Sequence, residues 1–139
     1  MAIVQAMCST FKAEILGGIH DLDTDTLQIA LYTSAATLGA ATTTYTTSDE
    51  VVGVNYVAGG NTILSPVISL DGTTGIFDCA DSTWTAATIT ARGALIYNAT
   101  KANRAIAVLD FGSDKISTAG NFTVIMPTAA AATALIRIA

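Results

Sequence analysis

The sequence has few charged residues. Asp, Glu, Lys and Arg together make up 12% of its 139 residues, about half the share in an average soluble domain. Hydrophobic residues make up 51%, and Thr, Ser, Ala and Gly replace most of the missing charge. Few strongly hydrated groups would lose water if another protein covered such a surface. The composition therefore favours a chain that packs against other protein copies.

Basic residues are scarce and scattered. There are six of them against eleven acidic residues, which gives a net charge of −5 and a pI near 4.4. Binding to a nucleic-acid backbone normally needs a cluster of Lys and Arg. The six are dispersed along the chain, so we expect no direct contact with nucleic acid: Lys12, Arg92, Lys101, Arg104, Lys115 and Arg137.

Long apolar runs are also missing. The longest candidate, residues 129–139, is interrupted by Thr133 and Arg137 and is shorter than the about 20 residues of a membrane-spanning helix. At the N-terminus no basic segment precedes an apolar core, as a signal peptide would require. We therefore expect a protein that is made in the cytoplasm and has no membrane partner.

Cysteine and histidine are nearly absent. Cys8 and Cys79 lie far apart, without the Cys or His companions of a zinc site, and buried free thiols are favoured over a disulfide between them. The single histidine, His20, follows Gly17 and Gly18. We interpret it as a surface or cap histidine at the C-terminal end of a helix, rather than as a general base or metal ligand.

The run of alternate aspartates, Asp21, Asp23 and Asp25, resembles the start of a calcium-binding loop. Thr26 stands where the turn glycine of that loop belongs, and Tyr32 stands where its bidentate glutamate belongs. Aspartates before a strand commonly form turns through bonds to the backbone. Turn formation is therefore favoured over metal binding, and no cofactor is expected.

The sequence contains no nucleophile elbow of the G-x-S-x-G type and no glycine-rich phosphate loop. Carboxylates at Asp78, Asp81 and Asp110 are the candidates for an acid and base pair of a glycosidase. The chain has one Trp, four Tyr and four Phe, too few for a sugar-binding platform. We expect that the protein is not an enzyme.

The apolar residues of the first 20 positions have helical spacing. Val4, Met7, Phe11 and Ile15 recur at intervals of three or four, which predicts a helix over residues 4–16. The Gly17-Gly18 pair supplies its stop, because glycine accepts the left-handed conformation after a helix.

Alternating or apolar runs bounded by turn residues predict strands over the rest of the chain. Pro66 marks an edge or bulged position, and residues 71–75 and 112–114 are predicted as turns. Residues 33–60 form a long loop, which is typical of a functional segment or one held by a partner. The predicted strands are residues 26–32, 61–70, 76–79, 85–98, 104–111, 121–126 and 134–138.

This pattern predicts one domain over residues 1–139. With one N-terminal α-helix and no helices between the strands, it favours a mainly β fold, an antiparallel β-sandwich or jelly roll. Residues 1–20 carry the helix, and residues 33–60 form the loop.

Four residues are candidates for an interface. Trp84 either anchors an interface or packs in the core. Arg92 either points outward at a subunit contact or pairs with a carboxylate of Asp78, Asp81 or Asp110. Tyr45 and Tyr56, together with Trp84, are the aromatic residues that a binding site for a host surface would use.

Five blocks of the sequence are similar to small virion proteins of tailed bacteriophages. They are structural blocks rather than catalytic motifs, and the resemblance implies a particle component located in the virion. The blocks are residues 3–8, 11–16, 26–38, 90–98 and 107–115.

The resemblance implies a capsid cement, or decoration, protein as the first hypothesis. Its partners would be the major capsid protein and copies of itself, so that many modest contacts hold one layer together by avidity. Two alternatives stay open: a homo-oligomeric ring component of the tail or tail fibre, and a host-surface binding module.

Overall fold

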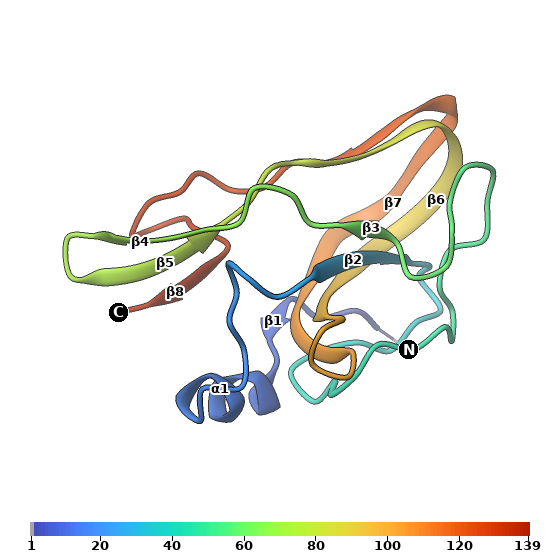
Figure 1. Ribbon diagram of the computed structural model, residues 1–139. Helices are drawn as coiled ribbons and strands as arrows, with labels where there is room; N and C mark the ends of the chain where they lie inside the picture. The colour runs from blue at the N-terminus through green and yellow to red at the C-terminus, as the bar shows by residue number, and fades with distance from the viewer. Residues whose placement is uncertain (1) are drawn as a thin grey trace.

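The computed structural model describes residues 2–139 and is mainly β (Figure 1). Its strands form two antiparallel sheets, one of five strands in the order β1-β7-β6-β2-β3 and one of three in the order β4-β5-β8. This confirms the predicted mainly β class with one N-terminal helix. The elements are β1 (Ala6–Met7), α1 (Ser9–Leu16), β2 (Leu27–Tyr32), β3 (Asn61–Thr62), β4 (Val67–Asp71), β5 (Thr74–Asp78), β6 (Ser82–Asn98), β7 (Arg104–Val124) and β8 (Ile136–Ile138).

The helix α1 ends where the sequence predicts but begins later. Ala6 and Met7 pair with β7 as the strand β1, so the predicted start at residue 4 is wrong. Local spacing is compatible with a helix there, but the free backbone of β7 offers a sheet ladder instead. After Leu16, Gly18 adopts a φ of +73° and its N–H bonds to Ile15 O at 3.2 Å, the stop that the glycine pair predicted.

The centre of the fold is a long hairpin of β6 and β7. The predicted turn at residues 112–114 and the separate strand at residues 121–126 are wrong, because β7 runs unbroken to Val124. Gly112, with a φ of +81°, and Ala119, with a φ of +47°, lie within the strand, and the pairing with β6 shifts register at several points. Such bulges bend a strand without ending it.

Burial along β6 changes between its two ends. From Ser82 to Ala91 buried and exposed residues mostly alternate, whereas from Gly93 to Asn98 every residue is buried. The second part is paired with β2 on one side and with β7 on the other. Most of the largest fully buried side chains belong to β2, β6 and β7, including Leu27, Ile29, Leu31, Ile89, Leu95, Ile96, Ile106 and Val108.

The predicted strand over residues 61–70 is divided in two. Ser65 has a φ of +53°, Pro66 follows it, and the chain passes from β3 in the large sheet to β4 at the edge of the small sheet. Pro66 thus interrupts pairing, as a residue without an N–H must. Beyond β4, Gly72 and Thr73 form a two-residue hairpin turn with Gly72 at a φ of +61°.

Candidate functional site: an exposed apolar surface

The three aspartates near α1 form a turn. Asp25 N–H donates to Asp21 O at 2.8 Å, and Asp21 N–H donates to Asp25 Oδ2 at 3.0 Å. This confirms the turn-forming interpretation for two of the residues, while Asp23 is exposed beside them. Across residues 2–139, no group of three or more His, Cys, Asp or Glu side chains is placed to hold a metal ion.

His20 follows α1, but it is buried and its ring nitrogens contact side chains rather than the last carbonyl groups of the helix, so its interpretation as a surface or cap histidine is wrong. Its Nε2 lies 2.9 Å from Glu14 Oε1, and its Nδ1 lies 3.0 Å from Asn98 Nδ2. Lys101 N–H donates to Asn98 Oδ1, which leaves the Asn98 amide group as the donor to His20 and, at 2.7 Å, to Asp25 Oδ2. His20 therefore ties the end of α1 to β6, and its partner Asn98 gave no signal in the sequence.

Arg92 forms an ion pair with Asp110, which is one of the two interpretations that the sequence left open. Its Nε lies 3.0 Å from Asp110 Oδ1, and Gly112 N–H donates to the same oxygen at 2.9 Å. The Gly112 N–H and Arg92 together hold the pKa of Asp110 below its usual range. Asp78 and Asp81 are elsewhere, where they accept bonds from the backbone N–H groups of Cys79 and Met126.

Trp84 lies in the core. Its side chain is 4% exposed and packs against Tyr56 and Phe122, with ring centroids 5.9 Å and 6.2 Å away. Of its two interpretations, core packing is the one that this burial supports. Cys8 is buried, Cys79 is half-buried, and both are free thiols, as the sequence favours.

Glu50 is a buried carboxylate that the sequence analysis did not identify. Tyr45 Oη donates to its Oε1 at 2.6 Å, Tyr56 Oη donates to its Oε2 at 2.6 Å, and Gly59 N–H donates to Oε2 at 2.8 Å. Tyr56 Oη also accepts Leu31 N–H from β2 at 2.9 Å. We call Glu50, Tyr45, Tyr56 and Gly59 the Glu50 cluster.

The other two tyrosines hold the same loop. Tyr97 of β6 stacks on Tyr45 with ring centroids 4.6 Å apart, and its Oη donates to Gly59 O at 2.7 Å. Tyr32 of β2 donates to Thr46 O at 2.5 Å. All four tyrosines of the chain therefore fix residues 44–60 to their own fold, and Tyr45 and Tyr56 direct their hydroxyls inward rather than to a ligand.

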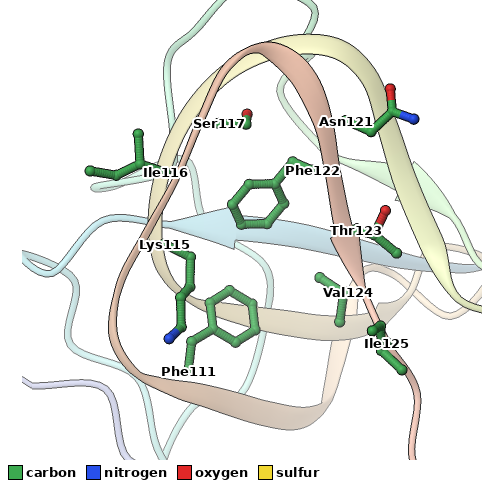
Figure 2. A pocket seen from close by; sticks show the side chains of 9 residues that line it. All are labelled: Phe111, Lys115, Ile116, Ser117, Asn121, Phe122, Thr123, Val124 and Ile125. Atoms are coloured by element: carbon green, nitrogen blue, oxygen red, sulfur yellow. The ribbon is translucent and has the colours of Figure 1, made fainter.

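The bent strand β7 surrounds a cavity of about 440 Å³ (Figure 2). The rings of Phe111 and Phe122 lie inside the arch of the strand with centroids 6.3 Å apart. Lys115 is the one charged residue among the nine that line it. The arrangement offers an apolar hollow with a single amino group, without a carboxylate partner in its lining.

Large apolar side chains are exposed over much of the surface. Twelve Val, Leu and Ile side chains are each more than half exposed, among them Val52 at 98%. They occur on the N-terminal segment and α1, on the loop before β3, between β3 and β4, on β7 and just after it, and on the small sheet. The twelve are Val4, Leu16, Val52, Val54, Val57, Leu64, Val67, Ile68, Leu70, Ile116, Ile125 and Ile138.

The small sheet carries the densest group of these side chains. Every residue of β4 is exposed, and the register places Ile68 beside Phe77 and Ile136, and Leu70 beside Gly75 and Ile138, on one face. A groove of about 350 Å³ separates this face from α1. In Figure 1 the small sheet projects at the left, with β4 and β8 flanking β5. We call residues Val67–Asp71 the β4 edge.

Comparison with known proteins gives no family for the chain: no family model, no curated protein and no solved structure matches it. Within the described part of the chain, no helix has both the length and the apolar character needed to cross a membrane.

Proposed function

We propose that the chain is a non-enzymatic structural protein of a tailed-phage virion, a capsid cement protein that packs on the major capsid protein and on copies of itself. The observation that carries the proposal is the set of twelve exposed apolar side chains on a chain with 12% charged residues. Exposed apolar side chains that gather on one element, as Val67, Ile68 and Leu70 do on β4, mark sites of contact with other proteins. The resemblance of five sequence blocks to phage virion proteins is the reason for proposing that the particle is a phage virion.

The hydrogen bonding of the buried polar side chains supports the same proposal. The buried charged and polar side chains His20, Glu50 and Asn98 are engaged by groups of their own chain. The exposed Val, Leu and Ile side chains are therefore the groups available for contact with a partner protein. A layer of such subunits would add many modest contacts, which avidity makes stable.

A host-surface binding module receives less support. That alternative needs exposed aromatic side chains at Tyr45, Tyr56 and Trp84. Tyr56 and Trp84 are buried, and Tyr45 is half-buried with its hydroxyl on Glu50.

Immunogold labelling of phage particles tests the proposal. An antibody against the purified chain, applied to particles from the strain that encodes it, should label the whole capsid surface, and quantitative mass spectrometry should find hundreds of copies per particle. Label confined to the tail, with tens of copies or fewer per particle, would show that the protein is a tail component and not a capsid cement protein. Particles without label would show that the protein is not part of the virion.

Particle stability gives a second readout. Particles that lack the protein should rupture at a lower temperature than complete particles, because the cement contacts are missing. Adding back the purified chain should restore the higher temperature. Equal rupture temperatures with and without the protein would contradict a cement role.

A further inference from the structure

We propose that two copies of the chain pair through the β4 edge, antiparallel and across a twofold axis at Ser69. Within residues 2–139, β4 pairs with β5 on one side, and no other hydrogen bond reaches the backbone of Ile68 or Leu70. All residues of the edge are exposed. An exposed edge with free N–H and C=O groups is a template for another strand.

The hairpin turn shows which backbone groups are free. Asp71 and Thr74 flank the two-residue turn, so they form a hydrogen-bonded pair, and such pairs alternate along an antiparallel ladder. Ser69 and Val67 therefore direct their backbone groups toward β5. Ile68 and Leu70 direct theirs outward, to the open edge.

One register uses both free residues. With Ser69 opposite Ser69 of the second copy, Ile68 of each copy lies opposite Leu70 of the other, and each such pair exchanges two hydrogen bonds. A shift of two residues toward the N-terminus brings in Pro66, which lacks an N–H. The opposite shift brings in Gly72, which belongs to the turn.

The side chains fit a second copy of this strand. Ile68 and Leu70, which are 52% and 74% exposed on the side of the sheet that carries Phe77, lie opposite each other across the paired edge and so cover each other. Asp71 lies opposite Val67 rather than opposite its own counterpart, and its Oδ2 already accepts Ala131 N–H at 2.6 Å. Lysine and internal proline, which protect many edge strands, are missing from residues 67–71. An edge that is complementary to itself favours an isologous dimer over a different partner.

The proposed function includes contact between copies of the chain, and this inference places that contact at the β4 edge. Its support comes from the geometry of the edge and does not depend on the virion assignment. It is tested on the purified chain alone. Failure here would leave the capsid contacts untouched, and failure of the labelling experiment would leave the dimer untouched.

Disulfide trapping tests the register. Residues opposite each other in a non-hydrogen-bonded pair have Cα atoms about 4.5 Å apart, within the range of a disulfide. In a Cys79→Ser background, Ser69→Cys should give a covalent dimer under mild oxidation at low micromolar concentration. Thr118→Cys, exposed on β7, is the control and should stay monomeric. Equal trapping of both variants would overturn the proposal.

Sedimentation equilibrium tests the interface itself. Leu70→Lys places an ammonium group in the paired edge and should weaken the dimer at least tenfold. Ile116→Lys is the matched control, because Ile116 is 70% exposed and Leu70 is 74% exposed, and it should leave the dimer unchanged. A monomeric wild-type chain, or a dimer that survives Leu70→Lys, would refute pairing at β4.

Discussion

At the scale of single residues, buried polar groups hold the irregular parts of the fold in place. Glu50 has three donors, and His20 lies between Glu14 and Asn98. Such groups are costly to bury unless every hydrogen bond is made, so each of them fixes the segments that supply its partners. For Glu50 these segments are separate parts of the loop, and Tyr56 joins them to β2 by accepting Leu31 N–H.

Replacing Glu50 by Gln should destabilise the chain by about 2 kcal/mol. The amide would place an N–H₂ against one of its present donors, and hydrogen bonds to a charged group contribute about 1.5–3 kcal/mol. Urea unfolding measures the change. Asp49→Asn is the control, because Asp49 is exposed, has a φ of +61° that Asn tolerates, and should shift stability by less than about 0.5 kcal/mol. Equal losses in the two variants would show that the Glu50 cluster contributes no stability.

The two thiols should be unreactive in the folded chain. Burial, and then Glu14, raises the pKa of Cys8 to about 11; burial, and then Asp78, raises the pKa of Cys79 to about 12. At neutral pH both are protonated, so a thiol-specific reagent should label them roughly 100-fold more slowly than in urea. Rapid labelling of the native chain at Cys8 would contradict its burial.

The same shifts set a pH limit on stability. A thiol whose pKa is raised on folding stabilises the fold fully below its unfolded value of 9.0, and this contribution is lost as the pH rises toward about 11. Urea unfolding should therefore show falling stability across that interval. The Cys79→Ser variant should fall less steeply than the wild-type chain, and a slope equal to that of wild type would exclude Cys79 as a cause.

At the scale of elements, close backbone contacts decide where the long loop lies. Gly60 has a φ of +80°, and a Cβ there would meet Ile29 O of β2 at 1.8 Å. The loop thus approaches β2 closely enough that only glycine fits, just before β3 begins. This contact and the Glu50 cluster act on the same loop.

Gly60→Ala should destabilise the chain by more than about 3 kcal/mol, because the backbone of the loop or of β2 must move. Gly18→Ala is the matched control: its φ of +73° is similar, but nothing lies within 4 Å of the new Cβ. Its loss should be about 1 kcal/mol, the cost of the backbone conformation alone. Urea unfolding of both variants separates the steric contribution from the contribution of the backbone conformation. Equal losses of stability would show that the backbone moves away from the new Cβ without destabilising the chain.

At the scale of the whole molecule, apolar contact surface is combined with a net charge of −5. Two copies that meet through apolar groups also repel each other, and salt screens that repulsion. Self-association should therefore tighten by roughly two- to fivefold from low to high salt, as sedimentation would show. Weaker association in high salt would mean that ion pairs hold the copies together, contrary to the apolar surface described above.

Much of the fold was predictable from local pattern. The strand that became β2, the turn at Gly72, the stop of α1 and the turn at Asp21 follow from residues that are neighbours in the chain. The errors share a cause. Residues 112–114 look like a turn, but the ladder with β6 carries β7 through them, and bulges absorb the irregularity. Ala6 and Met7 fit a helix, but pairing with Ala107 and Val108 makes them a strand.

By itself the sequence determined the mainly β class, the single N-terminal helix, the strand that became β2, and the low charge that favours contact with other proteins, because these depend on composition and on spacing of a few residues. Only the tertiary structure decided that Glu50 and His20 are buried, that Trp84 lies in the core, and that the β4 edge stays open. Each of these depends on groups that the fold brings together, or leaves apart, across long stretches of chain: His20 meets Asn98 across 78 positions, and no spacing rule reaches that far.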